Sequence, residues 1–223
     1  ENDYFFQQTN RYVVNINYKY EDTLGRIINI DADYGYFKKG NGNLQSNINK
    51  NQQNTIVSQN FNRAANGIDV NLKALKFDYT VNIWKGKFET GAKYSDIRAG
   101  NDFEFFHTIG GQDSLDENRS NTFQFNEQIA AGYVNYKKTF GKWVLQGGLR
   151  LENTSSDGTL RFLVKGVESI KHIPENYINL FPSLSISVKP KNNHSFSLGY
   201  SRRIDRPAYQ DLNPFVYILD ETK

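Results

Sequence analysis

Apolar and polar residues alternate strictly along much of the chain. In residues 11–20 the even positions are tyrosine, valine and isoleucine, whereas most odd positions are asparagine, arginine or lysine. Residues 28–36 repeat the pattern after a short turn at residues 21–25. Because successive side chains of a strand point to opposite faces, this pattern predicts a β-hairpin with one apolar and one polar face.

The same alternation predicts six further strands, over residues 68–83, 87–94, 128–138, 143–152, 182–188 and 195–200. Within the first of these, the apolar positions change parity between Ala74 and Leu75. One extra residue in a strand reverses the face of every side chain that follows, so this change predicts a β-bulge. In residues 128–138 alanine and glycine occupy both sets of positions, and the pattern does not assign a facing.

The predicted links between strands are alternately short and long. The short links are residues 21–25, 84–86, 139–142 and 189–193, and the long ones are residues 38–67, 96–127 and 153–177. Compact soluble domains seldom contain structureless loops of this length. Transmembrane β-barrels do, with short periplasmic turns and long extracellular loops. The sequence therefore predicts an all-β fold, an antiparallel transmembrane β-barrel segment of about eight strands.

Charged side chains of both signs occupy the predicted polar faces. They cannot form a dry core unless they are paired, so they suit a wide, wet lumen or one filled by a polar domain. The side chains predicted to face this lumen are Lys19, Asp31, Asp33, Lys87, Glu89, Lys93, Arg150 and Glu152. Tyrosine and tryptophan near the strand ends fit an interfacial girdle, although both residues favour strands in any sheet.

Composition narrows the classes of function. The 223 residues include no cysteine, which excludes disulfides, thiolate metal sites and cysteine nucleophiles. A formal net charge of +3 does not favour a nucleic-acid partner. No apolar run is long enough for a membrane-spanning helix. A mean hydropathy of −0.68 still allows a membrane barrel, because a lipid-facing strand is apolar only at alternate positions.

The last third of the chain carries the most specific motifs. Residues 177–185 read Tyr-Ile-Asn-Leu-Phe-Pro-Ser-Leu-Ser, and residues 202–215 contain Arg-x-Asp-Arg-Pro followed by Leu-Asn-Pro-Phe. With the strand at 194–201 and the hairpin around 141–154, they resemble the barrel of TonB-dependent outer-membrane receptors. More narrowly, they resemble the outer-membrane β-barrel family abundant in Bacteroidota. The resemblance is loose over the whole chain and specific from about residue 125.

This resemblance implies a barrel of about twenty-two strands in the bacterial outer membrane, with a plug domain in its lumen and a TonB box. We therefore interpret residues 1–223 as one partial barrel domain, and expect the plug and the remaining strands outside this sequence. The implied partners are outer-membrane lipid, the plug and TonB system, and a small ligand that is a glycan, a peptide or a metal chelate. The resemblance implies no cofactor.

No catalytic arrangement stands out in the sequence, and we predict no enzyme activity. The three histidines, His107, His172 and His194, lie far apart and lack the spacing of metal ligands. Acidic residues near position 115 lack the spacing of an EF-hand, so we predict no metal site.

Two groups of residues are candidate ligand contacts. Phe103, Phe105 and Phe106 lie in a predicted long loop, where their rings could stack on a sugar, cap a ligand or pack among the loops. Arg203 and Arg206 follow the last strand, where it is expected to emerge outward. The resemblance implies that this string holds a loop against neighbouring strands, with substrate contact as the alternative.

Three functions remain open at this point. The leading hypothesis is a receptor-transporter that binds its ligand at the outer loops and imports it with TonB-linked energy. The alternative is a structural or secretion-associated outer-membrane barrel without transport. The third is a soluble extracellular β-sandwich that binds glycans and needs no detergent.

Overall fold

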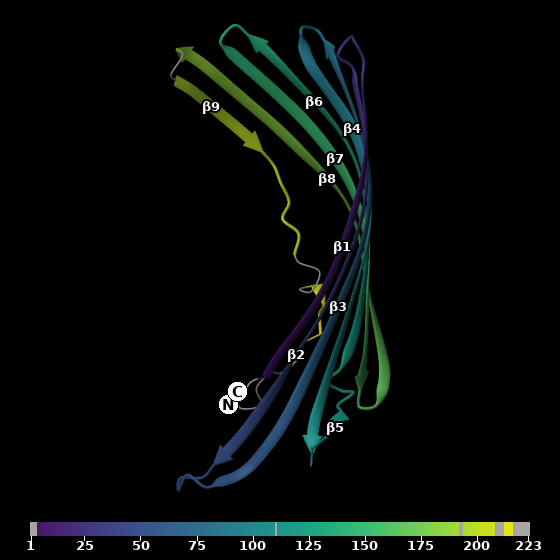
Figure 1. Ribbon diagram of the computed structural model, residues 1–223, viewed down its shortest axis with the longest axis vertical. Coiled ribbons are helices and arrows are strands. Elements are labelled where there is room, and N and C mark those ends of the chain that lie inside the picture. The colour runs from purple at the N-terminus through teal and green to yellow at the C-terminus, as the bar shows by residue number, and fades with distance from the viewer. Residues whose placement is uncertain (1–3, 110, 192–193, 208–211, 216–223) are drawn as a thin grey trace.

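The computed structural model describes residues 4–109, 111–191, 194–207 and 212–215, and most of those up to Ser201 form one curved antiparallel sheet (Figure 1). Its strands are β1 (Tyr4–Glu21), β2 (Ile27–Lys50), β3 (Ile56–Ile83), β4 (Gly86–Ile109), β5 (Gln112–Leu115), β6 (Asn121–Phe140), β7 (Trp143–Val164), β8 (Val167–Lys191) and β9 (His194–Ser201). Eight strands pair in the order β1-β2-β3-β4-β6-β7-β8-β9, and β5 pairs only with β4. The predicted all-β antiparallel class is confirmed, and the sheet is open rather than closed into a barrel. Among the described residues, no helix has the length and apolar character needed to cross a bilayer.

Strands join at two ends of the sheet, which we call the near end and the far end. The near end holds the turns at residues 22–26, 84–85 and 141–142, and the far end holds residues 51–55, 165–166 and the connection that contains β5. At the near end, Trp84 and Lys85 both have positive φ, 51° and 61°. Two consecutive residues of this kind form the turn that best matches the twist of a two-residue hairpin. The predicted short link at 189–193 lies partly in β8 and partly outside the described residues.

The predicted long links are, for most of their length, continuations of the strands. Residues 38–50 belong to β2 and residues 56–67 to β3, and the other two links are likewise mostly strand. Their Asn, Gln and Gly content suggested loops. However, a strand between two neighbours satisfies its backbone hydrogen bonds by pairing, whatever its side chains are. Strands β1 to β4 and β6 to β8 therefore have 18 to 28 residues, well above the roughly ten that a bilayer requires.

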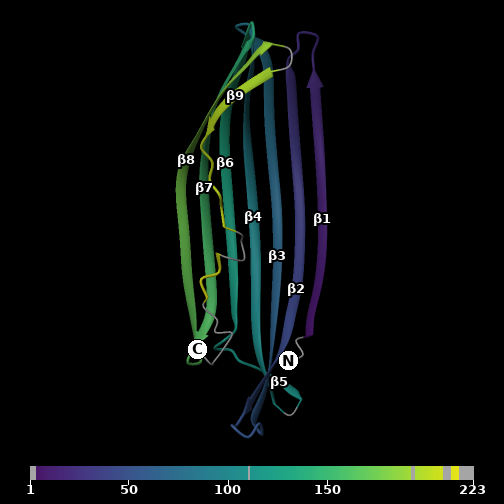
Figure 2. The ribbon, with the colours of Figure 1, turned by 90° about the vertical axis from the view of Figure 1, so that its left-hand side faces the viewer.

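Directly paired residues lie on the same face of the sheet, so the register assigns both faces. One rung across the sheet consists of Asn17, Asp31, Lys76, Lys93, Ala131, Glu152 and Asn179. This rung lies on the concave face, along which the C-terminal part of the chain runs (Figures 1 and 2). The alternate positions form the convex face, and they carry the predicted apolar sets of residues 12–20, 28–36, 75–83 and 143–151. The register also assigns β6, whose even positions 130–136 lie on the convex face.

The predicted β-bulge at Ala74 and Leu75 is wrong. Ala74 pairs with Asp33 and Leu75 with Ala32 in unbroken register, and the pairing with β4 is equally regular. The even apolar residues 68–74 consequently lie on the concave face, whereas the odd residues from Leu75 onward lie on the convex face. Side chains of β3 thus alternate between the two faces without interruption. What changes along the strand is which face carries the apolar residues.

Candidate functional site on the concave face

After β9 the chain leaves the sheet and lies against the concave face, in front of β6 to β8 (Figure 2). We call residues 202–207 and 212–215 the C-terminal segment. Its departure begins at Arg202, whose backbone N–H donates the last sheet-like hydrogen bond to Pro182 O at 3.1 Å. Pro207 has no N–H and cannot extend a ladder. The string therefore lies against the concave face of neighbouring strands and does not continue β9 toward the far end.

Arg206 anchors the first part of the segment. Its Nη2 donates to Glu152 Oε2 at 2.9 Å and to Thr154 Oγ1 at 3.2 Å, and its Nε lies 3.9 Å from Glu127 Oε1. Glu127, Glu152 and Thr154 are 5%, 8% and 0% exposed. Carboxylates that are buried this well need a cationic partner. Arg150 supplies a second one, because its Nε donates to Glu152 Oε1 at 2.6 Å.

Asn213 anchors the second part of the segment through amide groups. Its Nδ2 donates to Asn101 Oδ1 at 3.0 Å and to Asn121 Oδ1 at 2.9 Å. Its own Oδ1 accepts the backbone N–H of Phe215 at 3.0 Å, which fixes the turn at Pro214. One side chain thus connects the segment to β4 and β6.

An apolar cluster lies next to these polar anchors. Phe123, Phe125 and Leu160 are buried, and Leu212 and Phe215 of the segment pack against them together with Ala99 and Phe162. The rings of Phe162 and Phe215 meet edge to face, with centroids 5.9 Å apart. The segment is therefore held by both charge and apolar contact.

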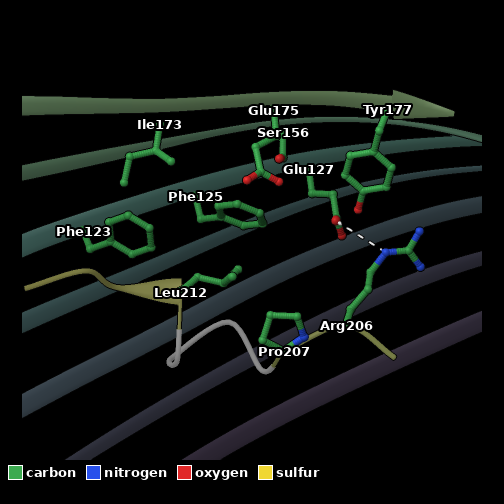
Figure 3. A pocket seen from close by; sticks show the side chains of 11 residues that line it. Phe123, Phe125, Glu127, Ser156, Ile173, Glu175, Tyr177, Arg206, Pro207 and Leu212 are labelled. Carbon is green, nitrogen blue, oxygen red and sulfur yellow. Dashed lines mark ion pairs between the residues drawn. The ribbon is translucent and has the colours of Figure 1, made fainter. Parts of the chain in front are cut away.

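A pocket of about 220 Å³ lies between the segment and the sheet (Figure 3). Phe123, Phe125 and Ile173 line its apolar part, and Leu212 and Pro207 close it from the segment's side. Its polar residues include Glu127, Glu175, Tyr177 and Arg206. This volume, with acidic and apolar walls, can hold a small amphipathic group.

The predicted phenylalanine contacts do not act together. All three lie on strand β4 and not in a loop, because β4 extends to Ile109. Phe103 and Phe105 are buried on the concave face. Phe106 lies on the opposite face, where the Arg63 guanidinium carbon is 4.0 Å from its ring centroid. The three rings therefore cannot contact one ligand together.

Arg203 and Arg206 also differ in their surroundings. Arg206 is half-buried between two carboxylates, whereas Arg203 is exposed beside a groove lined by Asp78, Glu89 and Tyr133. Arg206 is positioned by its hydrogen bonds to Glu152 and Thr154 of the sheet.

The structure places all eight residues predicted for the lumen on the concave face, as the register requires. Several are paired there. Lys87 Nζ lies 2.5 Å from Glu89 Oε1, and Asn17 and Asn15 donate to Asp31 and Asp33, each at 2.6 Å. Lys93 lines a second concavity on this face.

Sequence reasoning missed Glu127, Thr154, Asn101, Asn121 and Asn213. The first four lie in segments that the alternation predicts as long links, 96–127 and 153–177, so the face that they share could not be recognised. Asn213 lies in the Leu-Asn-Pro-Phe motif, but its partners are about 90 and 110 residues away and no local pattern identifies them.

The histidines are dispersed in the structure. His107 lies between Asn62 and Asp116, and the His172 ring nitrogen Nδ1 is 3.2 Å from Thr159 Oγ1. Within the described ranges, no group of three or more His, Cys, Asp or Glu could hold a metal ion.

The fold defines the chain's class: an open antiparallel sheet whose convex face is apolar and whose concave face is charged over the part next to the near end is a segment of a transmembrane barrel. Residues 19–223 match the model of the outer membrane protein beta-barrel family, and the chain belongs to that family. Its place is the bacterial outer membrane. A Bacteroidota source stays a prediction. No curated protein matches the chain.

Solved receptors share this fold. The siderophore receptor PiuA from Acinetobacter baumannii aligns with a TM-score of 0.58 at 17% identity, over 88% of this chain and 32% of that one. The ferric-catecholate import receptor Fiu from E. coli K12, in its open form, aligns with a TM-score of 0.62 at 12% identity, over 87% and 35%. The chain thus spans about a third of the length of these structures.

Proposed function

We propose that the chain is part of a TonB-dependent receptor barrel that imports a small ligand across the outer membrane. The near end faces the periplasm and the far end faces outward. The observation that carries the proposal is the part of the concave face next to the near end, which presents charged and amide side chains across the strands, as a wide wet lumen requires. The shared fold with PiuA and Fiu supports it.

The concave face has a role in this function. Charged pairs in the part next to the near end keep the wall hydrated, and the pocket beside Arg206 offers a small amphipathic site. The C-terminal segment forms one wall of that pocket. A ligand, whether a glycan, a peptide or a metal chelate, would meet this surface after it passes the far end.

Deletion of the gene tests the proposal. A strain without it should lose uptake of at least one compound from a panel of ferric siderophores, oligosaccharides and peptides. Complementation should restore uptake only when the TonB system is active. Unchanged uptake of the whole panel would favour the structural or secretion-associated barrel instead.

The soluble sandwich is not favoured. A sandwich needs two sheets packed face to face, whereas the described residues form one sheet. The convex face of this sheet carries exposed apolar side chains such as Ile16, Leu184 and Leu198, which are 69%, 61% and 74% exposed. We expect the full-length protein to need detergent or lipid to remain dispersed.

A further inference from the structure

The pocket between the C-terminal segment and the sheet carries a negative charge that its own walls do not balance. Arg206 pairs with Glu152 and lies 3.9 Å from Glu127. Arg150 is a second cationic partner of Glu152. Glu175 also lines the pocket, and within the described part of the chain no ion pair is found for it. Three carboxylates against two guanidinium groups leave this set one charge negative.

Glu175 is the carboxylate that an incoming group can reach. It lies on the concave face of β8, where it pairs in register with Ser156 of β7. Figure 3 shows its side chain directed into the pocket beside Ser156. Glu175 and Pro207 are exposed and Tyr177 is half-buried. The pocket is therefore open to the lumen at this side, and a cation can approach Glu175 without displacing a buried group.

The other walls of the pocket are mostly apolar. Phe123 and Phe125 stack with ring centroids 6.4 Å apart, and Ile173 continues this wall on β8. Pro207 and Leu212 face it from the C-terminal segment. Hydrocarbon gains free energy when it is buried against such walls, whereas sugar hydroxyls would lose hydrogen bonds to water there.

A lysine side chain combines the two properties that this pocket requires. Its hydrocarbon stem can be buried along an apolar surface while its ammonium group stays at a polar or charged position. The Tyr177 ring lies in the same pocket, and the face of an aromatic ring attracts a cation. Arg206 is already engaged by Glu152 and Thr154.

We propose that this pocket binds a lysine side chain of a peptide ligand. The stem lies against Ile173 and Pro207. The ammonium group pairs with the Glu175 carboxylate next to the Tyr177 ring. This inference rests on the proposed function, because it names the class of compound that the receptor takes up: a short peptide with a basic residue.

Binding of defined peptides to the full-length protein in detergent tests the proposal. The probe is Ala-Lys-Ala with both termini blocked. The same peptide with norleucine in place of lysine keeps the hydrocarbon stem and lacks the charge. Saturation-transfer NMR measures both dissociation constants, and the lysine peptide should bind roughly fivefold more tightly, as expected for one partly exposed ion pair.

Three variants separate the charge from the apolar walls. Glu175→Gln should weaken binding of the lysine peptide to the level of the norleucine peptide. Asp157→Asn is the matched control, because it removes an exposed carboxylate from the convex face of β7, and it should leave the preference unchanged. Ile173→Phe fills part of the pocket and should weaken binding of both peptides. Heat-modifiable migration on gels confirms that each variant is folded before binding is measured.

Four results would overturn the proposal. The first is equal binding of the two peptides by the unmodified protein. The second is loss of the preference in Asp157→Asn as well as in Glu175→Gln, which would indicate general charge attraction. The third is unchanged binding of both peptides in Ile173→Phe, which would place them elsewhere. The fourth is tighter binding of a glucosamine disaccharide than of the lysine peptide, which would assign the pocket to amino sugars.

The uptake panel distinguishes failure of this inference from failure of the proposed function. If deletion of the gene abolishes uptake of siderophores or oligosaccharides but of no lysine-containing peptide, the receptor function stands and this inference is wrong. If deletion changes no uptake at all, the receptor function is wrong, and the peptide measurements still decide whether the pocket binds lysine.

Discussion

The two halves of this sheet use the same strands in opposite ways. In the near half, between the near end and the rung of Ala32, Leu75 and Tyr94, the convex side chains are apolar and the concave ones charged. In the far half the order reverses. Val70 and Leu72 lie on the concave face there, whereas Asp69 and Asn71 lie on the convex face.

The reversal shows that the surroundings, and not the strand, decide which face is apolar. A strand in a bilayer must present apolar side chains outward to lipid. The same strand beyond the bilayer has water outside, and its apolar side chains are stabilised by packing inside, as Phe123 and Leu160 pack under the C-terminal segment. Substitutions should therefore have opposite consequences in the two halves.

The largest expected effect concerns the concave face of the far half. Phe123 is 3% exposed, and Phe123→Ala should lower the free energy of unfolding of the full-length protein by about 3 kcal/mol. Urea unfolding in lipid vesicles measures this. Phe61→Ala, on the convex face of the same half and 43% exposed, should cost well under half as much. Equal losses would show that the far half does not pack inward.

The second effect concerns the convex face. Leu149→Arg, in the near half of β7, should destabilise the protein by about 2–4 kcal/mol because a charge meets hydrocarbon. Thr159→Arg places the same charge on the same strand and face in the far half, where water replaces lipid, and should be nearly neutral. The same unfolding assay compares them. A substantial loss for Thr159→Arg would extend the lipid-facing region into the far half.

A smaller effect concerns the attachment of the C-terminal segment. Arg206→Gln removes the contacts to Glu127 and Glu152, which should weaken docking of the segment by about 2 kcal/mol. Hydrogen exchange at residues 212–215 should become faster by more than tenfold. Arg203→Gln changes an exposed neighbour in the same string and is the control. If both variants exchange alike, the ion pairs do not hold the segment.

The smallest effect is one of pH at the far end. Hydrogen bonding from Thr108, together with the Arg63 guanidinium, holds the pKa of Asp113 below its usual value. A lowered folded-state pKa stabilises β5 above the unfolded pKa of the carboxyl, and this stabilisation is lost as the pH falls through the folded pKa. Exchange protection of β5, corrected for intrinsic rates, should fall under acid conditions. Asp113→Asn should remove this pH dependence.

The strands of the near half and their two faces could be predicted from the sequence. There, apolar and polar residues alternate because one face of each strand contacts lipid and the other contacts water or polar groups. It was ambiguous at Ala74 and Leu75, since a β-bulge and a change of surroundings both reverse the apolar parity. Only the pairing with a neighbouring strand distinguishes these two explanations. Ala74 pairs with Asp33 and Leu75 with Ala32, without a shift in register.

The far half and the site were less predictable for physical reasons. Asn- and Gln-rich stretches such as residues 38–50 suggest loops, yet backbone pairing makes them strand. The contacts of Arg206 and Asn213 join residues more than fifty positions apart, which local patterns do not encode.

The most direct test follows single cysteines along β3, in a protein whose residues 1–223 contain no native cysteine and in which any cysteine outside them is replaced by serine. Each position from 68 to 81 in the full-length protein would carry an environment-sensitive fluorophore, with a quencher attached to the lipid acyl chains. The account predicts strong quenching at 75, 77, 79 and 81, and none at 68, 70, 72 and 74. Quenching that continues through the even positions 68–74 would place those residues against lipid and contradict the reversal of faces.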